Sequence, residues 1–178
     1  MSPLRNVDGQ AAALLAALAG VTPKPEDYQV LTDVFARNPD GTLASPHFRL
    51  HSNRDDLTRV LTCCALGWLY LASEPLVLWT TDRYVTARES FYQLADVIDA
   101  APVLRSRVAR IRRTNGDQEI RLTDGPRLMM RTRRMSTRGC RVGRLIIDEA
   151  GLFKGSQAAE LFPAMASVAD HQVIYGYA

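Results

Sequence analysis

Two adjacent carboxylates, Asp148 and Glu149, are the residues whose type and spacing point most directly to chemistry. They follow the apolar run Leu-Ile-Ile at 145–147, which is typical of a strand buried on both faces of a sheet. Such a strand places both charges at the carboxyl edge of the sheet, where open α/β sheets bind ligands. Phosphoryl transfer uses such a pair, because one carboxylate holds Mg²⁺ and the other polarises the attacking water. The alternative is a buried strand followed by a charged turn.

Arginines form the second chemical feature. The segment 105–144 holds thirteen arginines and no lysine against Asp117, Glu119 and Asp124, a local charge of +10 in a chain whose net charge is +3. A basic segment this concentrated can attract a polyanion. Arginine also suits phosphate recognition, or a finger that reaches into a neighbour's active site. The alternative is an exposed hairpin with solvated arginine faces.

Length and composition set the class of protein. A chain of 178 residues with 47% apolar residues forms one globular domain with a real core. No apolar stretch approaches the length of a membrane span. The three cysteines, Cys63, Cys64 and Cys140, show neither a disulfide framework nor a zinc spacing, which fits a reducing cytoplasm.

The elements that must position these side chains alternate along the chain. Helical patterns predict helices over 10–18, from 25 onward, and over 57–71, 85–98 and 157–168. Buried or alternating runs predict strands over 48–51, 76–81, 108–113, 119–122, 127–132, 145–147 and 172–175. Asn115-Gly116 and Asp124-Gly125 are hairpin turn signals. The alternation predicts a mainly parallel α/β sheet with a meander of hairpins.

Several short motifs follow one another in order. They are Pro25-Glu-Asp-Tyr-Gln29, Asn38-Pro-Asp-Gly-Thr-Leu43, Leu66-Gly-Trp-Leu-Tyr-Leu71, Glu74-Pro-Leu-Val-Leu-Trp-Thr-Thr81, the hairpin 115–133, Ser136-Thr-Arg-Gly139, Leu145-Ile-Ile-Asp-Glu-Ala150 and Gln172-Val-Ile-Tyr-Gly176. In order and spacing they resemble the ATPase half of the phage terminase large subunit, the motor that packages DNA into viral capsids. The resemblance covers nearly the whole chain.

The resemblance implies an α/β fold of the P-loop NTPase type (ASCE/RecA-like), a mainly parallel sheet flanked by helices with a β-hairpin insertion. It implies one partial ATPase domain over 1–178, C-terminally truncated and without the family's nuclease domain. The implied activity is ATP hydrolysis with Mg²⁺, driving the packaging of viral double-stranded DNA. The implied partners are portal protein, the small terminase subunit and further copies in a ring, in the cytoplasm of the bacterial host and away from membranes.

The resemblance also assigns residues to roles. It implies that Asp148 binds Mg²⁺ with Thr58 as second contact, and that Glu149 orients the attacking water. Gln29 is implied as an adenine contact, with an ordinary polar residue at a helix start as the alternative. Arg138 is implied as a finger acting on a neighbouring subunit's phosphate, with a solvated turn arginine as the alternative.

One departure from the family concerns the phosphate site. The family carries a P-loop of the type Pro-Arg-Gln-Asn-Gly-Lys-Thr, and counting back without gaps from the helix end places 52–58 there. Asp56 then holds the glycine position and Leu57 the lysine position, and only Thr58 fits. One repulsion between unit charges at 4 Å is worth roughly 4 kcal/mol at an effective dielectric of about 20. We therefore expect impaired ATP binding, with Arg54 or Arg59 as the residues able to replace the lysine in part.

Two other functions remain open at this point. The first is a non-catalytic terminase remnant that binds nucleic acid or co-assembles through its arginine-rich hairpins. The second is an unrelated helicase-type ATPase, which shares the strand ending in Asp-Glu-Ala and no other motif.

Overall fold

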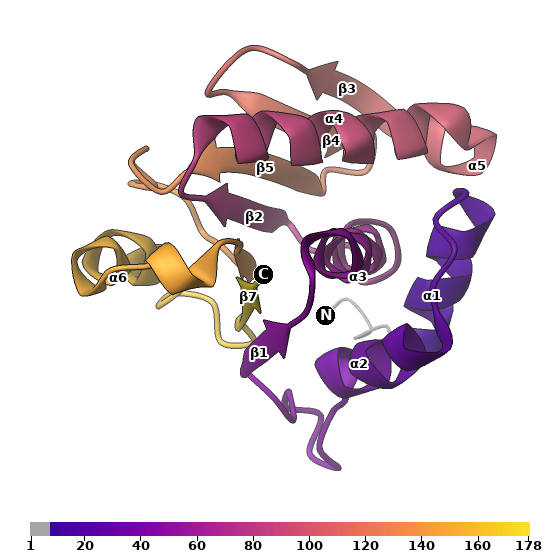
Figure 1. The fold of residues 1–178 in the computed structure, drawn as a ribbon, viewed down its shortest axis with the longest axis horizontal. Helices are drawn as coiled ribbons and strands as arrows, with labels where there is room; N and C mark the ends of the chain where they lie inside the picture. The colour runs from indigo at the N-terminus through magenta and orange to yellow at the C-terminus, as the bar shows by residue number, and fades with distance from the viewer. Residues whose placement is uncertain (1–7) are drawn as a thin grey trace.

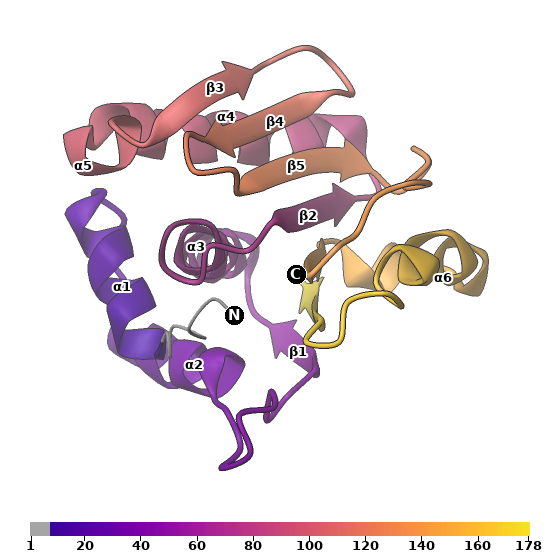
Figure 2. The same cartoon turned by 180° about the vertical axis from the view of Figure 1, so that it is seen from behind.

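The computed structural model describes residues 8–178, which form one seven-stranded sheet in the order β1-β7-β6-β2-β5-β4-β3 (Figures 1 and 2). The strands are β1 (His47–His51), β2 (Leu76–Thr81), β3 (Val108–Arg112), β4 (Gln118–Leu122), β5 (Arg127–Thr132), β6 (Arg144–Ile147) and β7 (Gln172–Tyr177). The five strands from β1 to β5 in this order are parallel, and β4 and β3 continue the sheet antiparallel. The prediction of a mainly parallel α/β sheet with a hairpin insertion is confirmed.

Helices cover both faces of this sheet. They are α1 (Gly9–Leu18), α2 (Pro25–Phe35), α3 (Arg54–Leu66), which continues as a π-helical turn over Gly67–Leu71, α4 (Tyr84–Ala100), α5 (Pro102–Arg105) and α6 (Gly155–Leu161), with 3₁₀ turns at Ala150–Leu152 and Phe162–Ala164. In Figure 1, α3 and α4 lie on one face, α1 and α2 form an outer layer beside α3, and α6 lies on the other side of β7. Among the described residues no helix is both long and apolar enough to cross a membrane.

Strand alternation divides the core between the two faces. In β2, which is buried along its whole length, Val77 and Trp79 face the large cluster under α3 and α4. Leu76 and Leu78 face a smaller cluster under α6. Because successive side chains of a strand point to opposite faces, a strand in the middle of a two-sided sheet must be apolar on both faces, as β2 is over most of its length.

Two glycines let the outer helices approach one another and α3. A Cβ on Gly9 would lie 2.2 Å from the carbonyl carbon of Leu31 in α2. A Cβ on Gly67 would lie 2.7 Å from the ring of Phe35 and 2.8 Å from the Cβ of Ala12. Both positions therefore require glycine for close helix packing. This packing holds α3 in place, with its start at the carboxyl edge of the sheet.

Two helix boundaries differ from the sequence-based expectations by three residues or more. Helix α3 begins at Arg54 rather than at 57, because Asn53 caps it by accepting a hydrogen bond from the amide of Asp56. The helix expected over 157–168 ends at Leu161 and tightens into a 3₁₀ turn containing Pro163. Proline supplies no amide hydrogen to continue the helical ladder.

Candidate functional site

Asp148 lies at the carboxyl end of β6, and its side chain is fully buried. Its Oδ1 accepts hydrogen bonds from Arg54 Nη1 at 2.8 Å and from the Glu149 amide at 2.8 Å. Its Oδ2 accepts from Arg54 Nη2 at 2.7 Å and from Trp79 Nε1 at 3.4 Å. A buried carboxylate needs such partners to remain charged. Both carboxylate oxygens of Asp148 thus accept hydrogen bonds from the protein itself.

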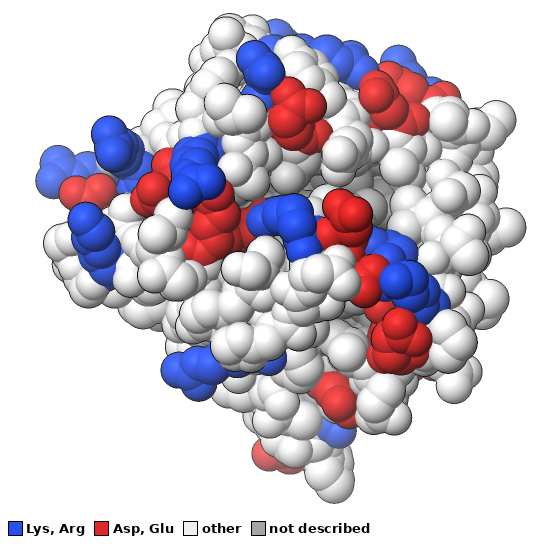
Figure 3. Space-filling model, viewed as in Figure 1, with Lys and Arg blue, Asp and Glu red and all other residues white. Residues whose placement is uncertain are grey.

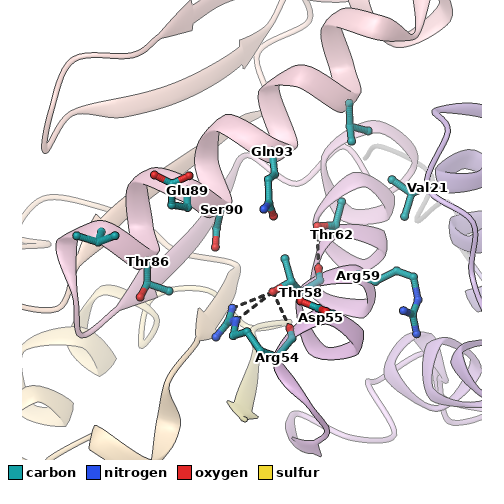
Figure 4. Close-up of a pocket in the computed structure, with 12 residues that line it drawn as sticks. Val21, Arg54, Asp55, Thr58, Arg59, Thr62, Thr86, Glu89, Ser90 and Gln93 are labelled. Carbon is teal, nitrogen blue, oxygen red and sulfur yellow. Dashed lines mark hydrogen bonds between the residues drawn. The ribbon is translucent and has the colours of Figure 1, made fainter.

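Arg54, the first residue of α3, links Asp148 to Thr58. Its Nε and Nη2 donate to Thr58 Oγ1 at 3.1 and 3.0 Å, and that hydroxyl donates to the Arg54 carbonyl at 2.9 Å (Figure 4). The hydrogen bond to Asp148 holds the pKa of Arg54 above its ordinary value. Asp148 and Thr58, which the resemblance assigns to one Mg²⁺, therefore contact a single guanidinium group.

The connection between β1 and α3 is short. Only Ser52 and Asn53 separate the strand from the helix, so the residues aligned with the P-loop are helical from Arg54 onward. A P-loop needs a longer loop whose amide groups close around the phosphates. Residues 52–58, which the sequence aligns with such a loop, form a two-residue turn and the first part of α3.

The first turn of α3 carries its own anions. Asp56 accepts hydrogen bonds from Lys24 Nζ at 2.7 Å, Arg59 Nη1 at 2.6 Å and Asn53 Nδ2 at 2.8 Å. These bonds, that of Lys24 first, lower the pKa of Asp56 below its ordinary value. The negative charge of Asp56, which we expected to repel a polyphosphate, is thus compensated by Lys24 and Arg59. These two cations are then no longer free to bind a phosphate.

Arg59 is engaged in the same way. Its Nε donates to Asp27 Oδ2 at 2.6 Å and its Nη2 to Asp27 Oδ1 at 3.1 Å, in addition to its bond with Asp56. Asp27 in turn accepts from the Lys24 amide at the start of α2 at 2.7 Å. The second arginine that could replace the P-loop lysine therefore ties α3 to α2.

Glu149 caps the start of α4. Its backbone is in the left-handed region at φ 55°, and its Oε2 accepts from the amides of Asp82 and Arg83, each at 3.0 Å. Its Oε1 accepts from Thr86 Oγ1 at 3.1 Å. Orienting water would require this carboxylate to exchange these bonds, and the assigned role stays a prediction.

Arg133 supports the same turn and was missed as a site residue. It follows β5, is fully buried, and donates to the carbonyl oxygens of Asp148 and Glu149. Its Nη2 lies 3.6 Å from Asp82 Oδ1, and desolvation lowers its pKa. Sequence reasoning counted it with the hairpin arginines. The available signal was its position directly after a strand that ends at the same sheet edge as β6.

Gln29 and Arg138 lie outside this cluster. Gln29 is exposed on α2, where its Nε2 donates to Asp33 Oδ1 at 2.9 Å. Arg138 is exposed in the connection between β5 and β6, and its amide donates to Ser136 Oγ at 3.2 Å. Within residues 8–178 neither side chain hydrogen-bonds to Arg54 or Asp148. Their assigned roles, adenine contact and finger, stay predictions.

A cleft of about 470 Å³ opens between α3 and α4 beside the guanidinium. Figure 4 shows Thr86, Ser90 and Gln93 of α4 on one side, with Thr58 and Arg54 of α3 on the other. The cleft could admit a small polar molecule to the carboxyl edge of the sheet. Such a molecule would meet Arg54 before it could reach Asp148.

Taken together, these side chains do not fit a Mg²⁺–nucleotide in this conformation. The guanidinium of Arg54 covers both carboxylate oxygens of Asp148, and the turn before α3 has too few residues to enclose phosphates. In residues 8–178 no group of three or more His, Cys, Asp or Glu side chains is arranged to hold a metal ion.

Comparison with known proteins gives a consistent fold. No protein-family model and no curated protein matches the chain. The large terminase of bacteriophage HK97 is similar in structure, with a TM-score of 0.72 and 17% identity over 86% of this chain and 33% of that chain. An ATPase-domain variant of the Thermus phage P74-26 large terminase gives a TM-score of 0.68 and 12% identity, covering 90% of this chain and 67% of that chain.

A third structure, the large terminase of a thermophilic bacteriophage in complex with ADP, gives a TM-score of 0.61 and 14% identity over 86% of this chain and 38% of that chain. The present chain thus spans well under half of the HK97 protein and of this ADP-bound protein. These likenesses show that the chain has the fold of a phage large-terminase ATPase domain, a P-loop NTPase-like α/β fold.

Proposed function

We propose that the chain corresponds to the ATPase domain of a phage terminase large subunit and takes part in packaging viral double-stranded DNA without hydrolysing ATP, with its nucleotide site closed by Arg54. The fold supports its place in the terminase large subunit. The bidentate contact of Arg54 with Asp148 is the observation that carries the closed site. Residues 1–178 would form one ATPase-type domain of this subunit.

The closed site follows from the charges. Asp148 is a buried anion, and Arg54 supplies the positive charge that a metal ion would otherwise supply. Hydrogen bonds to charged groups contribute about 1.5–3 kcal/mol each when well shielded. Because the Arg54 side chain is 38% exposed, we take roughly 3 kcal/mol for the pair together. That value corresponds to about a hundredfold weaker binding of any cation that must displace the guanidinium.

The proposed setting follows from the same role. The domain would work in the bacterial host cytoplasm, in a ring of subunits seated on a portal protein and supplied with DNA by a small terminase subunit. In this assembly the chain would contribute DNA contact and subunit packing without turning over ATP. The non-catalytic interpretation of the sequence is thereby favoured over an active ATPase, because Asp148, Glu149, Arg54 and Arg59 are all engaged with other parts of the protein.

The test measures two equilibria with the purified chain, binding of a fluorescent ATP analogue with Mg²⁺ and binding of a labelled DNA duplex. We expect duplex binding that does not change when Mg²⁺ and ATP are added, and no saturable binding of the analogue. Micromolar binding of the analogue would show that Arg54 does not close the site. Absence of duplex binding would contradict the packaging role itself.

A further inference from the structure

Most arginines of the basic segment have a carboxylate nearby. Nine of the thirteen lie within ion-pair distance of a carboxylate; these are Arg105, Arg107, Arg112, Arg113, Arg121, Arg127, Arg131, Arg133 and Arg144. On the hairpins, Glu119 pairs with Arg121 and Arg127, and Asp117 with Arg112 and Arg131. Residues 108–132 keep a charge of +3, because they hold six arginines against three carboxylates, but five of these six arginines have a carboxylate partner.

The unpaired arginines have a different location. Within residues 8–178, Arg110, Arg134, Arg138 and Arg141 have no carboxylate within ion-pair distance. Three of these four are exposed in the connection between β5 and β6, and only Arg110 is on a hairpin strand. Most of the arginines without a carboxylate partner thus lie in one connection.

Two hollows flank this connection. Arg134 and Arg138 line a hollow of about 540 Å³ against α6, together with Glu160. Arg134 also lines a second hollow of about 380 Å³ with Lys154 and Asp82. Glu160 is in no ion pair among the described residues, whereas Asp82 lies 3.6 Å from Arg133. Exposed Arg134, Arg138 and Lys154, which we call the basic loop face, therefore border two adjacent hollows with one free carboxylate.

The surface view agrees with this grouping. Figure 3 shows basic side chains gathered at the left of the molecule, over the β5–β6 connection and α6, with a few acidic side chains among them. Charges spread along an exposed surface match a series of phosphates better than they match one small anion. Arginine adds bidentate geometry for each phosphate.

We propose that the basic loop face contacts the phosphate backbone of double-stranded DNA. This inference rests on the proposed packaging role and names the surface that would carry it. Each phosphate neutralised by a cationic side chain releases counterions, so that binding weakens with added salt in proportion to the number of contacts. Arginines that are already paired with carboxylates contribute less to this effect. We accordingly place the main contact on the basic loop face and not on the hairpin strands.

The test compares two double variants that change the net charge equally. Arg134→Ala with Lys154→Ala removes two charges from the basic loop face, and leaves Arg138 in place. Arg112→Ala with Arg121→Ala removes two paired hairpin charges. Binding of a labelled duplex is measured by fluorescence anisotropy across a series of salt concentrations. We expect the slope of log Kobs against log salt to fall by about two for the first variant and by clearly less than about one for the second.

The outcomes separate this inference from the proposed function. Equal slope changes in the two variants would place the DNA contact elsewhere, while duplex binding by the wild-type chain would still support the packaging role. Absence of duplex binding by the wild-type chain would overturn both. Arg134→Lys keeps the charge, so it should keep the wild-type slope, and thermal melting checks that each variant is folded.

Discussion

The position of the Asp148 carboxylate in the fold could be predicted from the sequence, whereas its interactions could not. An apolar strand that ends in two acids marks the edge of a parallel sheet, and the structure places Asp148 there. The partner could not be predicted, because Arg54 reaches Asp148 across 94 residues of sequence. Its contact depends on where α3 begins, and that boundary is set by the Asn53 cap.

Removing the guanidinium tests this contact. Arg54→Ala leaves a buried carboxylate with the Glu149 amide and Trp79 as donors, so we expect a loss of about 3 kcal/mol in the free energy of unfolding. The freed Asp148 and Thr58 oxygens should also bind Mn²⁺, a paramagnetic substitute for Mg²⁺. Urea denaturation and Mn²⁺ electron paramagnetic resonance measure the two effects.

The matched control for this change is Arg88→Ala, which removes an arginine paired with exposed Glu89. It should leave stability nearly unchanged, because exposed ion pairs contribute little, and it should bind no Mn²⁺. If the wild-type chain bound Mn²⁺ as tightly as Arg54→Ala, the guanidinium would not be masking the carboxylate.

The Asp56 cluster predicts a dependence of stability on pH. Ion pairs hold the pKa of Asp56 below its ordinary value of 3.8 in the folded chain. Its stabilising contribution is therefore complete above about pH 4 and is lost as the pH falls toward the folded value. The difference in urea midpoint between wild type and Asp56→Asn should be constant from about pH 7 to about pH 4 and should narrow below that.

Asp55→Asn makes the same charge change one residue earlier, where the carboxylate is in no ion pair among the described residues, and serves as the control. A difference between wild type and Asp56→Asn that stayed constant down to about pH 2 would show that the ion pairs do not favour the charged form of Asp56.

Among the elements, the strands were predicted most closely. The pattern of 76–81 matches β2 at both ends, and the hairpin turns at Asn115-Gly116 and Asp124-Gly125 separate the strands as expected. Helix starts were harder, because Arg54, Asp55 and Asp56 carry no apolar side chain and extend α3 beyond its apolar pattern. The cap residue Asn53 and the acidic first turn are the signals that could have located this start.

Helix packing depends on positions that periodicity does not reveal. Gly9 and Gly155 are both the first residues of helices, but only Gly9 lies against another backbone. Gly9→Ala should lower the free energy of unfolding by about 2 kcal/mol through overpacking between α1 and α2. A Cβ on Gly155 would meet nothing within 4 Å, so Gly155→Ala should change the free energy of unfolding by no more than about 0.5 kcal/mol. Thermal or urea unfolding measures both, and equal effects would contradict the close approach of the helices.

For the molecule as a whole, the resemblance predicted the sheet and its hairpin insertion, and the structure confirms this architecture. The charge count of the arginine-rich segment was less informative. The value of +10 already includes Asp117 and Glu119, but it does not show which arginines these carboxylates pair with. Such pairing depends on strand register, which composition does not give. The surface that we propose for DNA therefore lies in the β5–β6 connection, and the salt-dependence experiment tests that placement.

The measurement that tests the central claim most directly is equilibrium binding of a fluorescent ATP analogue with Mg²⁺ to the unmodified chain. Restoring the family's glycine and lysine with Asp56→Gly and Leu57→Lys would not give a useful comparison, because Leu57 is fully buried in the core and lysine there would disturb the fold. We predict no saturable binding, since Arg54 covers Asp148 and the turn before α3 cannot enclose phosphates. Micromolar binding that is lost in Asp148→Asn would contradict this prediction and would show an open nucleotide site at the end of β6.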